Sequence, residues 1–253
     1  MPGLLTLLLA LQGAVHAELA DIQKRGEIRI VMSGDYPPFS QPALSGGLEG
    51  FDADVAREIA TRLKVKPVLI KAEFSSIVAG LQAGNFDLAV ASQSKTPERA
   101  KAVDFLSQPY YYDGAQLFVP RNSTATSLAD LKGKPVAVAL GTTFEKFLRA
   151  QNYANIVTFQ GEPDEYLALG SGRAAGMVTT RTVGSVAAKK GQPIKAVGPV
   201  LQQDNPYISL GQNQPKLKAA VEQALDAMRK DGTLKRISEK WIGSDVVTPP
   251  KAP

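Results

Sequence analysis

Hydrophobic and polar positions alternate along the chain in a way that predicts strands and helices in turn. Ile28 to Met32 and Pro67 to Ile70 are short apolar runs of strand length. Between them, Val55, Ile59 and Leu63 recur at the spacing of one helical face, in a helix that begins near Phe51. Strands that alternate with helices of this length are typical of α/β architecture.

The second half of the chain continues the same alternation. Pro135 to Leu140 is an apolar run that predicts a buried strand, and a capping box formed by Thr142 and Glu145 opens the helix after it. Lys216 to Met228 and Leu234 to Trp241 show the pattern of amphipathic helices. We expect these two helices to pack against the elements formed by the first part of the chain.

A faint internal repeat suggests two units of similar topology. The pattern predicts a helix from Ser75 to Gln82 with Gly84 as its C-cap, followed by a strand from Phe86 to Ala91. Residues 81–91 match residues 169–179 in the placement of helix end, glycine and strand. A chain of 253 residues is long enough for two modest domains, so the repeat favours two lobes.

The composition narrows the possible functions. At 44% hydrophobic and 21% charged residues, the chain resembles ordinary globular proteins. It has no cysteine, and His16 is its one histidine. Catalytic triads, histidine bases and ordinary zinc sites are therefore not expected downstream of that residue, and we expect no metal and no cofactor. The net charge of +5 is spread over short basic pairs without an aromatic-interleaved stripe, so no nucleic-acid partner is expected.

The first seventeen residues have the pattern of a secretory signal peptide. The apolar run from Leu4 to Leu11 is too short to span a bilayer, and Val15 and Ala17 are small residues at the −3 and −1 positions of a cleavage site. We therefore expect residues 1–17 to be removed on export and Glu18 to begin the mature protein.

The segment after Ala91 carries the clearest candidate for a binding site. A hydroxyl-rich turn with Ser92 and Ser94 comes first, and Thr96 as N-cap with Pro97 behind it then predicts a helix. Arg99 would lie in the first turn of that helix, where the helix dipole disfavours a cation.

An anionic ligand such as a carboxylate would explain an arginine at this position, because a guanidinium binds a carboxylate through two parallel hydrogen bonds. The alternative is a solvated surface arginine with no ligand.

Short motifs run in order from about Ile28 to Trp241. They are S-x-T-P-E-R-x-x-x-V-D-F (94–105), G-D-Y-P-P-F-S (34–40), G-F-D-A-D-V-A (50–56), L-Q-A-G-N-F-D (81–87), P-Y-Y (109–111), L-A-D-L-K-G-K-P-V-A-V (128–138), G-T-T (141–143) and R-K-D-G-T-L-K-R-I (229–237). Together they resemble the periplasmic polar-amino-acid-binding proteins of ABC importers, the bacterial extracellular solute-binding proteins of family 3.

The resemblance implies the type II periplasmic-binding-protein fold, with two α/β lobes joined by a two-segment hinge. Lobe 1 would hold residues 18–114 and 202–253, and lobe 2 would hold residues 115–201. The implied function is capture of an amino acid or related small carboxylate by hinge closure, and its delivery to an inner-membrane ABC permease. The protein would be a monomer in the periplasm, without a lipid anchor and without catalytic activity.

The resemblance also implies a set of ligand-binding residues. Arg99, Ser94 and the backbone around Ser92 would bind the ligand carboxylate from lobe 1. Thr142 and Thr143 would present a helix N-terminus from lobe 2. The ligand side chain would lie between two aromatic rings, those of Tyr36 and Phe74.

Two positions depart from the family pattern, Thr180 and Ser33. The resemblance places a carboxylate for the ligand's α-ammonium where this chain has Thr180, and a hydroxyl cannot neutralise a buried ammonium. Asp35 is a possible substitute, and Arg181 would suit an anionic ligand if it pointed inward. Basic-amino-acid binders of the family also carry an acid where this chain has Ser33, and some have a polar residue where it has Phe144. A cationic lysine or arginine ligand is therefore disfavoured, whereas a neutral or acidic amino acid and a carboxylate without an ammonium both remain open.

Two other functions are open on the same fold. Cyclohexadienyl dehydratases resemble this chain as well, but they carry a glutamate where this chain has Val183, and no acid lies between Glu165 and Asp204. The sequence therefore shows no obvious proton donor for that reaction. A module that presents its ligand to a sensory receptor is the third interpretation.

Overall fold

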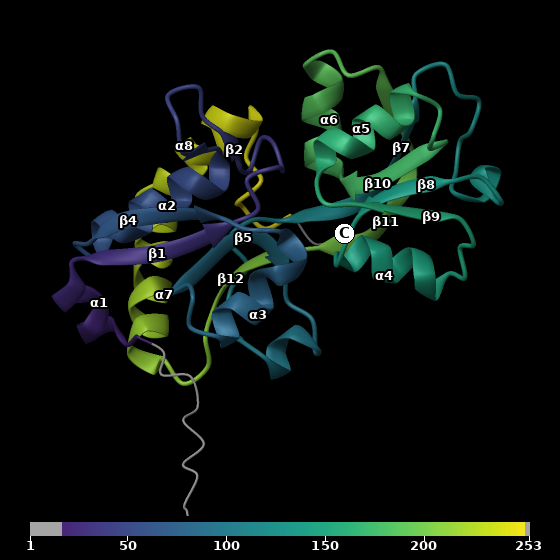
Figure 1. Cartoon of the computed structure of the whole chain (residues 1–253). Coiled ribbons are helices and arrows are strands. Elements are labelled where there is room, and N and C mark those ends of the chain that lie inside the picture. Colours follow the sequence, from purple (N-terminus) through teal and green to yellow (C-terminus); the bar gives the residue numbers. More distant parts are fainter. Residues whose placement is uncertain (1–16, 251–253) are drawn as a thin grey trace, which may run out of the picture.

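The computed structural model describes residues 17–250 and shows two α/β lobes side by side (Figure 1). The predicted signal peptide falls almost entirely on residues 1–16, outside the described residues. The first sheet has the order β4-β1-β5-β12-β6, in which β1 is parallel to β4 and β5, and β12 is antiparallel to β5 and β6. Its strands are β1 (Glu27–Met32), β4 (Lys66–Lys71), β5 (Leu88–Ser94), β6 (Asp104–Phe105) and β12 (Pro206–Leu210).

Five helices and a small hairpin accompany the first sheet. The helices are α1 (Leu19–Arg25), α2 (Phe51–Arg62), α3 (Ile77–Gln82), α7 (Pro215–Lys230) and α8 (Thr233–Ile242), and the hairpin strands are β2 (Gln41–Pro42) and β3 (Leu48–Glu49). As the amphipathic pattern predicted, the two C-terminal helices pack on this lobe: α7 and α8 contact each other and α2. Short 3₁₀ turns occur at Phe74–Ser76, Arg99–Lys101 and Ala129–Leu131.

The second lobe contains a five-stranded sheet of order β11-β7-β10-β8-β9. Its strands are β7 (Asp113–Pro120), β8 (Val136–Ala139), β9 (Ile156–Phe159), β10 (Gly176–Thr180) and β11 (Ile194–Asp204), and its helices are α4 (Thr143–Ala150), α5 (Glu162–Gly170) and α6 (Arg181–Lys189). The strands β10, β8 and β9 are parallel, whereas β7 is antiparallel to both β10 and β11.

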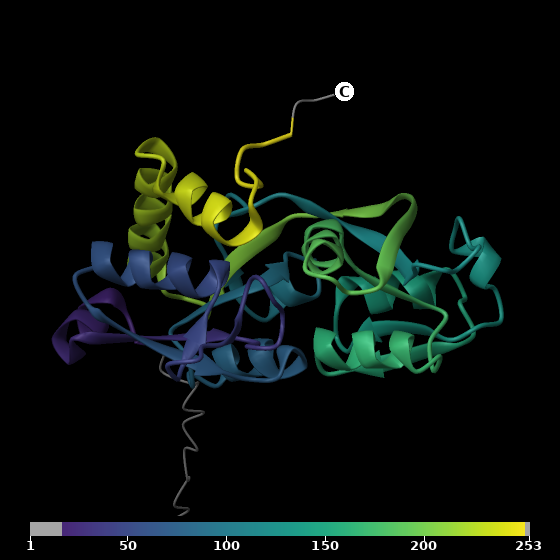
Figure 2. The ribbon, with the colours of Figure 1, turned by 90° about the horizontal axis from the view of Figure 1, so that it is seen from above.

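The chain crosses between the lobes along β7 and β11, which pair with each other in the region that joins the two bodies (Figures 1 and 2). β7 follows the first-lobe strand β6, and β11 leads back into the first-lobe strand β12. The first lobe is therefore built from two separate chain segments, which confirms the predicted two-lobed α/β fold with a double connection. The proposed boundaries after residues 114 and 201 fall inside these two strands and remain predictions.

The internal repeat corresponds to equivalent turns in the two lobes. In the first lobe α3 ends before Gly84 (φ +72°), and β5 follows; in the second lobe α5 ends before Gly172 (φ +74°), and β10 follows. A positive φ at both turns explains the repeated glycine, since residues with a Cβ rarely adopt it.

One predicted helix is wrong. The strand β5 extends to Ser94 instead of ending at Ala91, and the segment after Thr96 forms only the 3₁₀ turn Arg99–Lys101. The Thr96 hydroxyl does accept a hydrogen bond from the Arg99 backbone N–H at 3.2 Å, as an N-cap would. However, the chain enters β6 at Asp104, and the turn is not extended into an α-helix before that strand begins.

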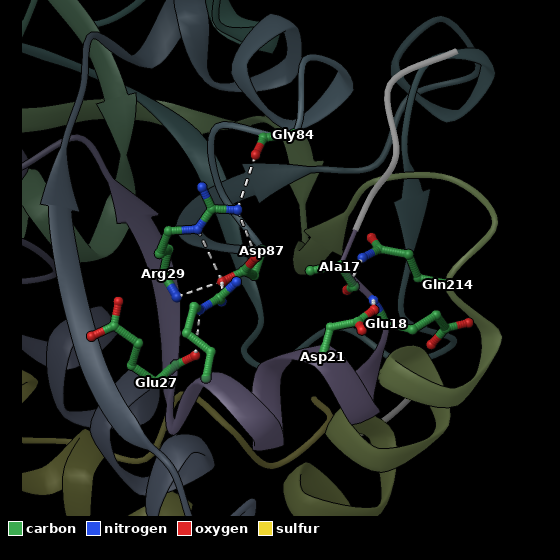
Figure 3. Close-up of polar contacts among 9 residues, drawn as sticks. Ala17, Glu18, Asp21, Glu27, Arg29, Gly84, Asp87 and Gln214 are labelled. Atoms are coloured by element: carbon green, nitrogen blue, oxygen red, sulfur yellow. Dashed lines mark hydrogen bonds and ion pairs between the residues drawn. The ribbon is translucent and has the colours of Figure 1, made fainter. Parts of the chain in front are cut away.

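Figure 3 shows a buried carboxylate that ties the first lobe together. The side chain of Asp87 is 1% exposed and forms ion pairs with Arg25 and Arg29. It also accepts a hydrogen bond from the Arg29 backbone N–H at 2.7 Å, and Arg29 donates to the Gly84 carbonyl at 2.9 Å. This network fixes the end of β1 against the turn between α3 and β5.

Within residues 17–250, no helix is long and apolar enough to cross a membrane.

Candidate functional site

A cleft between the two lobes contains most of the predicted site residues. The space inside it, with the open solvent at its mouth included, is about 510 Å³. Its lining comes from both lobes and from the returning crossing strand: Ser33, Asp35, Tyr36, Phe74, Ala91, Ser92, Ser94, Ala139, Thr142, Thr143, Phe144, Gln160, Gly161, Glu162 and Asp204. Arg99 lies beside the cleft, with its guanidinium 5.4 Å from the centre of the Phe74 ring.

The lobes touch across this cleft. The Tyr36 hydroxyl donates to the Thr180 hydroxyl at 3.1 Å, and the Glu162 backbone N–H donates to the Asp35 carbonyl at 3.2 Å. Gly161 faces Asp35 so closely that a Cβ built on the glycine would lie 2.6 Å from Asp35 Cγ. The absence of a side chain at Gly161 therefore permits the two lobes to approach each other.

Arg99 joins the lobes through two backbone carbonyls. Its Nη1 donates to the Ser94 carbonyl at 2.8 Å, and its Nη2 donates to the Gly141 carbonyl of the second lobe at 2.9 Å. A guanidinium has five N–H groups, so donors remain for an anion. Burial lowers the pKa of Arg99, and Asp204 opposes that effect through its negative charge. Because its guanidinium lies against Phe74 of the cleft lining and bonds to Ser94 and Gly141, Arg99 is the candidate for binding a ligand carboxylate.

Asp204 is a site residue that the sequence analysis did not identify. It is 5% exposed and ends β11, the strand that returns to the first lobe. Its Oδ1 accepts hydrogen bonds from the Ser94 hydroxyl of the first lobe and from the Thr143 hydroxyl of the second lobe, the latter at 3.2 Å. Burial raises the pKa of Asp204, while these hydroxyls and Arg99 lower it. The signal in the sequence was weak, since a single acid in the polar run 202–205 is typical of a surface loop.

Glu162 is a second carboxyl group in the cleft that the sequence did not reveal. It is 2% exposed at the start of α5, where one oxygen accepts from the Thr179 hydroxyl. The other oxygen is buried without a hydrogen-bond partner among the described residues. Burial raises the pKa of Glu162, and the negative charge of Asp35 raises it further. Asp35 itself lines the cleft, and burial raises its pKa as well.

Ser92 contributes to the cleft in a different way from the other hydroxyl residues. Its hydroxyl donates to Asp52 at 2.9 Å, and its backbone N–H donates to the Tyr110 hydroxyl at 2.8 Å. Tyr110 also donates to Asp52, at 2.7 Å. With φ at +51°, Ser92 has a left-handed backbone that this buried network holds in place. Its side-chain donor is therefore used inside the first lobe.

Two of the predicted threonines cap helices. Thr142 accepts from the Glu145 backbone N–H at 3.2 Å, while the Glu145 carboxylate accepts from the Gly141 backbone N–H at 2.7 Å. The predicted capping box thus reaches one residue further back than expected. Thr180 caps α6 by accepting from the Val183 backbone N–H at 3.3 Å. Each cap stabilises its helix while the residue faces the other lobe.

Arg181 does not line this cleft. It lines a separate cavity with Asp113 and Asp245. The charged residues that line the cleft are three acids, Asp35, Glu162 and Asp204, and Arg99 lies beside them. The positive charge of Lys71 acts on Asp35 and partly offsets the effect of burial on its pKa. Of these acids, the sequence indicated only Asp35, as a possible substitute for the carboxylate missing at position 180; Glu162 and Asp204 were not identified as site residues. Within residues 17–250, no cluster of histidine, cysteine and acidic side chains has an arrangement that would hold a metal ion.

Comparisons with known proteins agree with this geometry. The L-cystine-binding protein TcyJ of Escherichia coli (strain K12) is 34% identical over 233 residues, which are 90% of this chain and 87% of that protein. An ancestral arginine-binding protein, solved bound to glutamine, superimposes with a TM-score of 0.81 at 34% identity, covering 87% of this chain and 99% of that one. The ancestral amino acid-binding protein AncCDT-1, a precursor of cyclohexadienyl dehydratase, gives 0.83 at 34% identity, covering 88% and 99%.

Residues 28–244 match the family described as bacterial extracellular solute-binding proteins, family 3. The match covers most of the chain, and the relatives share the two-lobed architecture and the function of solute binding. The chain belongs to this family and is the solute-binding component of an ABC transporter.

Proposed function

We propose that this protein captures an α-amino acid with a charged ammonium group, closes its lobes around it and delivers it to an inner-membrane permease. It acts as a monomer in the periplasm. The observation that carries the proposal is the charge of the cleft lining, where the buried carboxyl groups of Glu162 and Asp204 and the half-buried one of Asp35 lie with Arg99 beside them. A zwitterion supplies both a carboxylate for Arg99 and a cation for the acids.

A carboxylate without an ammonium fits this cleft poorly. Such a ligand would bring a further negative charge next to Asp35, Glu162 and Asp204, whose pKa values burial already raises. Leaving buried charges without partners costs several kcal/mol. The cleft therefore favours the zwitterion. A cationic side chain, which Ser33 and Phe144 disfavoured in the sequence, is compatible with the remaining acids.

The relatives support this class of ligand. TcyJ is named for L-cystine, and the ancestral arginine-binding protein holds glutamine. Phe74 and Phe144 line the cleft near the threonines, so the ligand side chain would contact aromatic surface as well as acids.

A dehydratase activity is the second candidate, and one observation favours it. Glu162 is a buried carboxyl group with a raised pKa in the cleft, which is what a general acid requires. However, the substrate of a cyclohexadienyl dehydratase is prephenate, which is a dianion, and the acids of this cleft disfavour a dianion. We therefore propose ligand capture without catalysis.

A thermal-shift screen on protein that has been unfolded and refolded to remove bound ligand tests the proposal. The panel holds the twenty amino acids, L-cystine, dicarboxylates, keto acids and prephenate. A ligand at a thousand times its Kd adds about 4 kcal/mol of stability, roughly 10 °C for a chain of this length. The proposal expects a shift of this size with at least one amino acid. Shifts with ammonium-free carboxylates alone would contradict it, and turnover of prephenate would establish the enzyme.

A further inference from the structure

We propose that Asp204, together with the hydroxyl oxygens of Ser94 and Thr143, binds the α-ammonium group of the amino acid. The proposal deepens the proposed function, on which it rests. It places the cation-binding group on the returning crossing strand, while the usual family position holds Thr180.

The direction of the hydrogen bonds is the first step. Ser94 and Thr143 each have one hydroxyl proton, and both protons point to Asp204 Oδ1. The hydroxyl oxygens are 3.4 Å apart. With their protons committed, both hydroxyls present only lone pairs to the cleft. Two such oxygens beside a carboxylate are acceptors, so they suit a group with three N–H donors.

The second oxygen of Asp204 gives the next step. Oδ2 has no hydrogen-bond partner within residues 17–250, although Asp204 lines the cleft and is nearly buried. Arg99 does not form an ion pair with Asp204. The Arg99 guanidinium donates instead to the carbonyls of Ser94 and Gly141. A buried carboxylate without an ion-pair partner is costly, and a ligand ammonium at Oδ2 would reduce that cost.

The position of Arg99 completes the geometry. Arg99 donates to the carbonyl of the same Ser94 whose hydroxyl donates to Asp204, so the cation and the anion flank one residue. An α-amino acid carries its carboxylate and its ammonium on adjacent atoms. A cation and an anion on either side of Ser94 match that arrangement.

Asp204 also connects ligand recognition to closure. Its carboxylate, at the end of β11, is bonded to Ser94 of the first lobe and to Thr143 of the second. An ammonium bound there would contact groups of both lobes and of the connection between them. Binding energy at this point therefore favours the closed arrangement.

Isothermal titration calorimetry on Asp204→Asn tests the assignment. The probes are L-arginine and L-glutamine, and the matched analogues without an α-amino group, 5-guanidinopentanoate and glutaramate. We expect Asp204→Asn to weaken binding of whichever amino acid the wild type binds by on the order of 100-fold or more. Binding of the matching analogue should stay within about threefold of wild type or become tighter, since the variant removes a repulsive charge.

Asp113→Asn is the matched control. Asp113 is the cross-strand partner of Asp204 on β7, is 2% exposed and has the same charge, but it lines the separate cavity with Arg181. This variant should bind the amino acid within about threefold of wild type. Circular dichroism melts verify that both variants fold.

The outcomes are distinguishable. If the wild type binds neither L-arginine, L-glutamine nor any other amino acid of the screen, the proposed function fails. If the wild type binds an amino acid and Asp204→Asn binds it equally well, the assignment of Asp204 is overturned. Equal losses for an amino acid and its analogue would also overturn it, because Asp204 would then act on closure and not on the ammonium.

Discussion

Asp87 and Asp204 are both buried carboxylates, yet their surroundings are opposite. Asp87, at 1% exposure, is paired with two arginines and a backbone N–H, and its network lies entirely within the first lobe (Figure 3). Asp204, at 5% exposure, receives two hydroxyl protons and forms no ion pair within residues 17–250, and it faces the cleft between the lobes. A buried acid that the protein itself neutralises stabilises the fold, whereas a buried acid that lacks an ion-pair partner and lines a cleft is a candidate for binding a cationic group of a ligand.

Removing the paired acid should have the largest effect on stability. Asp87→Ala leaves Arg25, Arg29 and a backbone N–H facing a vacated site, which should cost about 3–5 kcal/mol of unfolding free energy. Urea unfolding measures this loss. Affinity per folded molecule should stay within about twofold of wild type. A loss below 1 kcal/mol would mean that the two arginines are satisfied by water and that the contrast with Asp204 is invalid.

Asp52 lies between these two extremes, since it is fully buried and bonded only to the hydroxyls of Ser92 and Tyr110. Burial raises its pKa from 3.8 to about 7, so the folded state binds a proton that the unfolded state has already released. Stability should therefore fall as pH rises from about 4 to 7, by at most roughly 4 kcal/mol, and stay reduced above pH 7. The unfolding free energy of Asp52→Asn, followed across the same pH range, should be less steep than that of wild type. Parallel curves would contradict this account.

The cation of the cleft should dominate affinity. Arg99→Ala removes the guanidinium next to Phe74 and should weaken amino-acid binding by about 100-fold or more, because a charge-assisted pair to the ligand carboxylate is lost. Lys101→Ala, at an exposed lysine of the same 3₁₀ turn, is the control and should bind normally. Calorimetry on both variants distinguishes a binding arginine from a surface arginine, and unchanged affinity in Arg99→Ala would remove it from the site.

The smallest effect is expected at the position where the family pattern has an acid. Thr180→Asp keeps an oxygen that can cap α6 and accept from Tyr36. Because Asp204 already supplies the carboxylate for the ammonium, we expect affinity to change by less than about threefold. A gain above tenfold in calorimetric titrations would indicate that the ammonium lies at residue 180, and it would weaken the contrast between Asp204 and Asp87.

The fold was largely predictable because the spacing of apolar residues indicates helices and strands, and because glycines mark where helices end. The helix beginning at Phe51, the strand 28–32 and the helix–glycine–strand repeat all appear in the structure. The helix predicted after Thr96 failed because its start signal was read without knowing that β6 begins at Asp104. Capping residues indicate where a helix can begin. They do not indicate that a strand which pairs with a distant part of the chain, here β12, begins a few residues later.

The site was only partly predictable, for a related reason. Ser94 and Arg99 were found because they lie within one short motif. Asp204 was missed because it is 110 positions from Ser94, and only the returning strand β11 brings the two together. Glu162 was missed because an acid at the first turn of a helix already has an ordinary explanation in the helix dipole. Only the three-dimensional structure shows that one of its two carboxyl oxygens is buried without a hydrogen-bond partner among the described residues.

The measurement that tests the central claim most directly is a crystal structure of the protein with the tightest-binding amino acid of the screen. The account predicts the ligand carboxylate on Arg99 and the ammonium nitrogen about 2.8–3.0 Å from Asp204 Oδ2, with Ser94 and Thr143 accepting from it. An ammonium bound elsewhere, with Asp204 still contacting only the two hydroxyls, would contradict the account.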